Sequence, residues 1–232
     1  KNIELVKDGQ ELDLRVCEEA LDVGRSVDKL GVLLSPHAPE LMDDVIDRVT
    51  SSTFGIRTGY PLLDEIWING WGPGWLIVPV APPKRYKSTF CLNLALNIAG
   101  PSQGHDVLYY SCEISEDLAA IRSMINFTGL NEKVVYRETA KFKEEVRRSV
   151  SMALSGEILL TGFAAGTASI ADLKAHARMV VNQGLKPKAI FIDYADTIRR
   201  DDSKRDKQKA DHLQQADVYT QARQFGSEFG CP

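Results

Sequence analysis

Apolar runs alternate with stretches of helical periodicity from residue 56 onward. Short runs rich in β-branched and aromatic side chains predict buried strands over 75–81, 106–112, 157–162 and 188–195. Helical spacing predicts helices over 88–100, 115–130, 143–154, 169–184 and 210–230, the second of them with Ser115 as its N-cap. Strands that alternate with helices in this way form a mostly parallel sheet with helices on both faces. The pattern therefore predicts an α/β fold.

The first 53 residues have a different pattern of apolar and polar positions. They are acidic and compatible with helix, they contain no strong strand pattern, and Ser35, Pro36 and Pro39 separate two short helices. We interpret residues 1–53 as a helical arm and linker and residues 54–232 as a globular domain. We expect this domain to be truncated at its C-terminal end, because the last helix leads toward another buried strand.

The composition of the chain excludes several classes of protein. The chain has 232 residues and a net charge of −4, with 28 Lys plus Arg against 32 Asp plus Glu, which excludes a uniformly basic nucleic-acid binder. No apolar run is long enough to span a membrane, and the N-terminus lacks the apolar core of a signal peptide. The four cysteines show no metal-binding spacing. We expect a cytoplasmic protein with free thiols and no membrane partner.

A turn-rich loop between a predicted strand and a predicted helix has the context of a phosphate-binding P-loop. Amides at the helix start would cradle phosphates, Lys87 would neutralise them, and the Ser88 hydroxyl would bind Mg²⁺. Tyr86 stands where the pattern G-x-x-x-x-G-K-[ST] has a glycine, which allows positive φ and a close backbone approach. The alternative is a basic strand-to-helix turn. The candidate nucleotide-binding residues are Ala81, Pro82, Pro83, Lys84, Arg85, Tyr86, Lys87, Ser88 and Thr89.

Two carboxylates follow other predicted strands. Asp193 is in position to hold Mg²⁺ together with Ser88, and Glu113 is in position to orient or deprotonate an attacking water. Each has an ordinary alternative, as a strand-end cap for Asp193 and as a solvated carboxylate near a helix N-terminus for Glu113. The carboxyl ends of parallel strands form the ligand-binding edge of open α/β sheets, so we expect both to lie near Lys87.

The same segments resemble a known family. The blocks FGIRTGYPLLDEIWINGWGPGWLIVPVAPPKRYKSTFCLNLALNIA, VLYYSCEISEDLAAIRSMINFTGL and AIFIDYADTIRR are similar, in this order, to those of the RecA-like ATPase domain of DnaB-type replicative helicases. The resemblance covers roughly residues 54–232. It implies a RecA-like P-loop NTPase core that uses ATP and Mg²⁺, with Glu113 as catalytic base and Asp193 as the Walker B aspartate. Tyr86 and the pair Ala195 and Asp196 depart from the family pattern.

The resemblance also implies partners. It implies a homo-oligomeric, hexameric ring around single-stranded DNA, a primase or loader as a further partner, and the cytoplasm of a bacterium or of a phage-infected host. Residues 199–209 carry six basic and three acidic residues, and a ring would gather this charge around the strand. A solvated loop of mixed charge is the alternative. The candidate nucleic-acid-binding residues are Arg199, Arg200, Lys204, Arg205, Lys207 and Lys209.

The function that the sequence favours is an ATP-dependent replicative DNA helicase motor, which couples hydrolysis at subunit interfaces to translocation and unwinding. A catalytically degenerate RecA-like structural or loader subunit is the alternative, and Tyr86 favours it. A recombinase or clock-type RecA relative is a third interpretation. The family's next strand, with a glutamine sensor, and a distal arginine finger would lie after Pro232.

Overall fold

The computed structural model describes residues 43, 46–47, 55–82, 84–199 and 211–232. The chain divides into two units, Lys1–Thr53 and Phe54–Pro232, of which the second carries the elements discussed below. Nearly all of the predicted helical arm over residues 1–53 lies outside the described residues, as does the basic run from 200 to 209.

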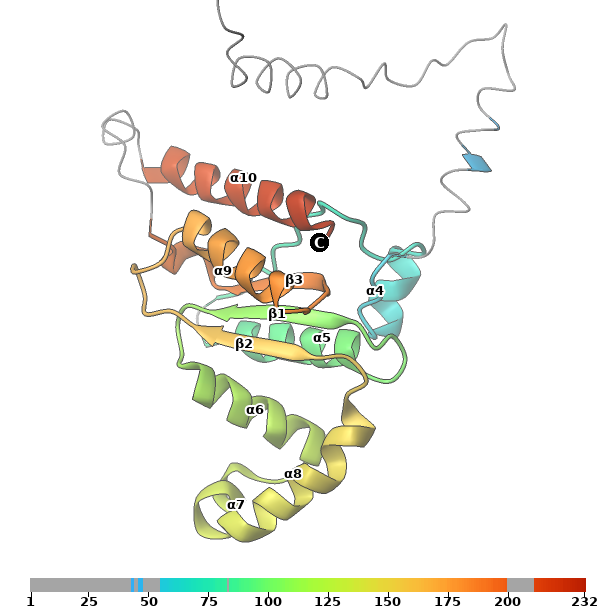
Figure 1. Cartoon of the computed structure of the whole chain (residues 1–232), viewed down its shortest axis with the longest axis vertical. Helices are drawn as coiled ribbons and strands as arrows, with labels where there is room; N and C mark the ends of the chain where they lie inside the picture. The colour runs from blue at the N-terminus through green and yellow to red at the C-terminus, as the bar shows by residue number, and fades with distance from the viewer. Residues whose placement is uncertain (1–42, 44–45, 48–54, 83, 200–210) are drawn as a thin grey trace, which may run out of the picture. The chain divides into compact units, whose positions relative to one another are not determined.

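A parallel sheet forms the centre of the second unit (Figure 1). Its strands are β1 (Asp106–Ser111), β2 (Ile158–Gly162) and β3 (Pro187–Asp193), in the spatial order β2-β1-β3. The register pairs Tyr109 with Leu160 on one side and with Phe191 on the other. The central strand is fully buried from Val107 onward, as its continuous apolar run requires.

Helices cover both faces of this sheet, which confirms the predicted α/β class (Figure 1). One core cluster joins the sheet to α5 (Lys87–Ala99), and a second joins it to α9 (Ile170–Asn182) and α10 (Asp211–Phe229). The other described helical elements are α4 (Pro61–Ile66), α6 (Glu116–Thr128), α7 (Glu132–Arg137), α8 (Thr139–Ala153) and the short 3₁₀ element η1 (Ala195–Thr197). Within the described ranges, no helix combines the length and the apolar character that crossing a membrane requires.

Side-chain caps explain where two of the helices begin. Ser115 precedes α6 and accepts a hydrogen bond from the amide of Leu118, as predicted. Ser169 precedes α9 and forms a reciprocal capping box with Asp172. In each case the serine oxygen satisfies an amide that has no partner within the helix, so the sequence itself sets the first turn.

The prediction of a buried strand over 75–81 is wrong. This segment has no regular secondary structure, and Trp75, Val78 and Val80 are exposed. A strand needs a hydrogen-bonding neighbour, and the three described strands pair only among themselves. The apolar run is present, but it lies on the far side of a groove from β3, so its side chains stay accessible.

Candidate nucleotide site

The loop before α5 adopts the backbone conformation that a glycine would favour. Tyr86 is the N-cap of α5 with φ 60° and ψ 25°, in the left-handed region, and Lys84 also has a positive φ of 59°. Non-glycine residues reach this region at a cost of roughly 1–2 kcal/mol. The Tyr86 side chain is 79% exposed, so its ring has no buried packing to offset that cost.

The first turn of α5 is suited to an anion. It contains no acidic side chain, and no side chain caps its N-terminus. Its first amides therefore remain available to a ligand, at the positive end of the helix dipole. Lys87 opens this turn, and its Nζ donates a hydrogen bond to the carbonyl of Ala81 at 3.1 Å and lies 5.7 Å from the ring centroid of Tyr194. The lysine thus folds back across the loop.

Asp193 links the helix to the sheet. It ends β3, is only 4% exposed, and accepts a hydrogen bond at Oδ1 from the Ser88 hydroxyl at 3.1 Å. Its second oxygen, Oδ2, accepts from the hydroxyl of Tyr109 at 2.8 Å. The structure therefore brings together two predicted metal-binding residues that lie 105 positions apart in the chain.

Glu113 lies in the turn that follows β1, beside the end of β3. Ser111 pairs with Asp193 in the sheet, and the amide of Cys112 donates to the Asp193 carbonyl at 2.7 Å. The Ser111 hydroxyl donates to the carbonyl of Ile114 at 2.6 Å and closes the turn. The Glu113 side chain is exposed, so it is accessible to solvent.

The cysteine thiols near Asp193 stay protonated and unreactive at neutral pH. Burial, with a smaller contribution from the negative charge of Asp193, raises the pKa of Cys91 to about 12 and that of Cys112 to about 11. A neutral thiol is neither a nucleophile nor a metal ligand. Cys91, Cys112 and Cys231 are free, in agreement with the prediction for these three.

Ser88 and Asp193 suit a hard cation such as Mg²⁺. Both present oxygen, and Mg²⁺ is usually held by one or two carboxylates together with waters and the phosphates of a nucleotide. Among the described residues no cluster of three or more His, Cys, Asp or Glu could hold a metal by itself. This donor set fits a metal that arrives with a phosphate ligand.

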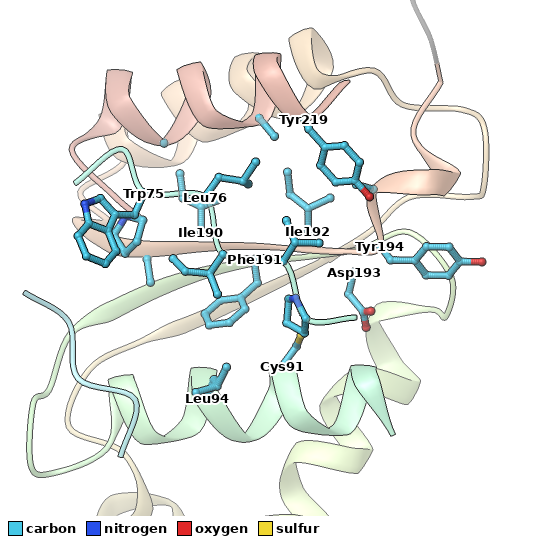
Figure 2. Close-up of a pocket in the computed structure, with 18 of the residues that line it drawn as sticks. Trp75, Leu76, Cys91, Leu94, Ile190, Phe191, Ile192, Asp193, Tyr194 and Tyr219 are labelled. Atoms are coloured by element: carbon cyan, nitrogen blue, oxygen red, sulfur yellow. The ribbon is translucent and has the colours of Figure 1, made fainter. Parts of the chain in front are cut away.

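An apolar groove continues from this site along β3 (Figure 2). It has a volume of about 250 Å³ and runs between the segment 75–81, β3 and α10, with Cys91 and Leu94 on the α5 side. Figure 2 shows Asp193 and Tyr194 at one end of the row formed by Ile190, Phe191 and Ile192. Lys87 and Asp193 both line the groove, so the polar site and the apolar groove are continuous.

The other predicted residues are placed as follows. Pro82, Lys84, Arg85 and Thr89 are exposed on the loop and the first turn of α5. Arg199 donates to Asp172 at 3.0 Å, so an acidic neighbour offsets part of its charge. The residues that lie outside the described ranges are Pro83, Arg200, Lys204, Arg205, Lys207 and Lys209.

Known proteins share the sequence pattern and the fold of this domain. A sequence model of the DnaB-like helicase C-terminal domain matches residues 55–232. The chain belongs to this family. The RecA-like resemblance of residues 54–232 is thereby confirmed at the level of family and fold. A search of curated proteins gave no match.

Two solved structures have the fold of this DnaB-like domain. One is an ATPase domain that is 14% identical with a TM-score of 0.68, over 85% of this chain and 69% of that one. The other is a DnaB-like replicative helicase, described with its interactions with primase, which is also 14% identical and has a TM-score of 0.67. This second match covers 99% of this chain and 53% of that helicase, so the chain spans about half the length of this relative.

Sequence reasoning missed Tyr109. The run DVLYYS indicates only an apolar strand, and nothing local distinguishes its two tyrosines. The alternation of side chains along β1 separates them, because Tyr109 reaches Asp193 whereas Tyr110 bonds to the carbonyl of Leu173. Only the sheet register could have identified the first of them as part of the site.

Proposed function

We propose that this DnaB-like domain binds and hydrolyses ATP as the motor of a replicative DNA helicase. The observation that carries the proposal is the Ser88–Asp193 hydrogen bond beside Lys87, at the open N-terminus of α5. A lysine, a hydroxyl and a carboxylate thus lie together in the arrangement that suits a nucleotide's phosphates and its metal.

Each side chain has a proposed role in this mechanism. Lys87 turns from the Ala81 carbonyl to the β- and γ-phosphates, while the first amides of α5 bind phosphate oxygens. Ser88 and Asp193 would hold Mg²⁺, which when bound neutralises charge on the phosphates. Glu113 orients the attacking water and accepts its proton. These contacts stabilise charge that develops during phosphoryl transfer.

Lys87→Ala tests this assignment. Loss of the lysine should lower the ATPase rate by about a hundredfold or more, because a fixed cation at the transferred phosphate is lost. Lys143→Ala, at an exposed position on α8, is the matched control and should keep the wild-type rate. Unchanged hydrolysis in the Lys87 variant would rule out this site.

Glu113→Gln separates binding from chemistry. The amide keeps the size of the side chain but cannot accept the proton, so hydrolysis should stop while nucleotide affinity is retained. Binding is measured with a fluorescent ATP analogue, and Glu144→Gln on α8 serves as control. Normal turnover in Glu113→Gln would exclude it as the base.

Single-stranded DNA and a ring of identical subunits are part of the same proposal. Family membership and the basic run at 199–209 support them, since six copies would concentrate the basic charge around one strand. A primase or loader would be a further partner. Single-stranded DNA should stimulate the ATPase, and raising the salt concentration should weaken this effect steeply. Salt-independent stimulation would contradict a phosphate-backbone contact.

A catalytically degenerate subunit is the second candidate. Tyr86 at the N-cap of α5 favours it, because a side chain at this position limits the close backbone approach to phosphate that a glycine allows. Thermal unfolding with ATP and Mg²⁺ decides between the two. A ligand at a hundred times its dissociation constant adds about 2.7 kcal/mol of stability. No shift at millimolar ATP would favour the degenerate subunit.

A further inference from the structure

Tyr109 is a buried phenol whose hydroxyl is directed at the candidate metal site. It lies on β1, the central strand, and is only 1% exposed. Its ring stacks on Phe191 of β3, with the centroids 5.7 Å apart and the planes 18° from parallel. Packing on the α5 side of the sheet therefore fixes the ring, and with it the direction of the hydroxyl.

The hydroxyl shares the Asp193 carboxylate with Ser88. Tyr109 donates to Oδ2 at 2.8 Å, and Ser88 donates to Oδ1 at 3.1 Å. With both oxygens engaged, the carboxylate is held in one rotation about its terminal bond. The oxygen that faces Ser88 is the one that can reach a cation bound beside that hydroxyl.

The phenol acts on the carboxylate as a hydrogen-bond donor. The Tyr109 hydroxyl carries one proton, and the hydrogen bond of 2.8 Å directs it at Oδ2 of Asp193. A neutral donor to a metal-binding carboxylate orients the carboxylate without competing for the metal.

We propose that Tyr109 is a positioning residue of the Mg²⁺–nucleotide site, which holds Oδ2 of Asp193 so that Oδ1 faces Ser88 and the cation. This inference rests on the proposed function, because it assigns a role within that same site. It goes beyond that function in adding a strand residue that touches neither the nucleotide nor the metal.

Tyr110 provides a matched control within the same strand. It is equally buried, but its hydroxyl donates to the carbonyl of Leu173 on the opposite face of the sheet. Tyr110→Phe therefore deletes a buried phenol hydroxyl, as Tyr109→Phe does, together with its contacts to the Leu173 carbonyl and to Nδ1 of His176, without touching Asp193. Any difference between the two variants in metal dependence reports on the Asp193 contact rather than on lost packing.

The experiment measures binding of a fluorescent ATP analogue while Mg²⁺ is titrated, in the wild type and in both variants. Tyr109→Phe should raise the half-saturating Mg²⁺ concentration about tenfold, since loss of a residue that orients a metal ligand typically weakens metal affinity by 10- to 100-fold. Saturating Mg²⁺ should restore binding. Tyr110→Phe should follow the wild-type titration. Tyr109→Met, which also removes the hydroxyl and fills irregular space, gives a second variant if Tyr109→Phe does not fold.

The outcomes separate this inference from the proposed function. Equal Mg²⁺ dependence in the wild type and in Tyr109→Phe would overturn the role of Tyr109 and leave the nucleotide site standing. A wild-type protein that binds no nucleotide at any Mg²⁺ concentration would overturn the proposed function and the role of Tyr109 together.

Discussion

The main-chain oxygen of Pro232 accepts a hydrogen bond from the amide of Ile190, at 3.2 Å. One residue earlier, the Cys231 carbonyl accepts from the amide of Gly74 at 2.8 Å. Residues 231 and 232 therefore lie between β3 and the start of the 75–81 segment, bonded to both. At this point residues 231 and 232, rather than the 75–81 segment, hydrogen-bond to β3.

Amide exchange along β3 should reflect this arrangement. Ile190 and Ile192 direct their amides to the same side of the strand, and Ile190 bonds to Pro232 there. We expect Ile190 to exchange more slowly than Ile192, which faces the groove. Removal of residues 231 and 232 should make the exchange rates of the Ile190 and Ile192 amides similar. The amide of Ala189, which is directed at β1, should stay protected. A rate for Ile190 that the deletion does not alter would contradict the geometry.

Tyr86→Gly should stabilise the fold by about 1 kcal/mol, because glycine adopts the left-handed conformation without a Cβ clash. Chemical denaturation measures the change in the free energy of unfolding. Thr89→Gly is the control with the opposite sign, since Thr89 lies in the first turn of α5 and its replacement by glycine should cost about 0.3 kcal/mol, the difference between the two helix propensities. Destabilisation by both variants would show that Tyr86 makes contacts that offset its backbone conformation.

The stability of the protein should fall as the pH drops below about 6.5 because of His176. Burial lowers the pKa of this histidine in the folded state, where its Nδ1 lies 3.2 Å from the Tyr110 hydroxyl. At pH values between the lowered pKa and the ordinary one, the unfolded chain therefore binds more protons than the folded protein. Acidification through this range shifts the equilibrium toward the unfolded state.

Urea midpoints at pH values of about 7.5 and about 5.5, on either side of the ordinary histidine pKa, check this prediction. His176→Gln should reduce the difference between the two midpoints. The control is His105→Gln, directly before the first residue of β1, which should leave the difference unchanged. A difference that persists in full in His176→Gln would assign the acid sensitivity to other groups.

Ser169→Ala should cost about 1 kcal/mol of stability. The serine hydroxyl accepts from the amide of Asp172 at 3.3 Å and donates to its carboxylate at 2.8 Å, and both bonds are lost in the variant. Ser151→Ala, at an exposed position inside α8, is the control and should be neutral or slightly stabilising. Equal effects in the two variants would mean that the capping box contributes nothing.

Local signals predict most of the fold. Ser115 marks the start of α6 as an N-cap, and Gly129 ends it with a φ of 66°. The apolar runs of β1 and β3 are long enough to predict buried strands. The short helices α4 and α7 escape prediction, because six residues carry too little periodicity to separate them from a loop.

The candidate site is only partly accessible from the sequence. Lys87, Ser88 and Asp193 can be predicted because each follows a strand-like run in a recognisable context. The contact between Tyr109 and Asp193 depends on the register of β1 against β3, which no local pattern contains. The error over 75–81 has the same origin, because hydrophobicity identifies a segment able to form a strand but not the neighbour with which it would pair.

The edge of β3 that faces away from β1 also bears on how the protein behaves at high concentration. Apart from the Ile190–Pro232 bond, no described strand pairs with this edge, and such an edge is a template for hydrogen bonding to another chain. The neighbouring Val78 and Val80 are exposed at 46% and 89%. A net charge of −4 offers little repulsion against such contacts. We therefore expect concentration-dependent self-association, which Val80→Lys should suppress by placing a charge beside the edge.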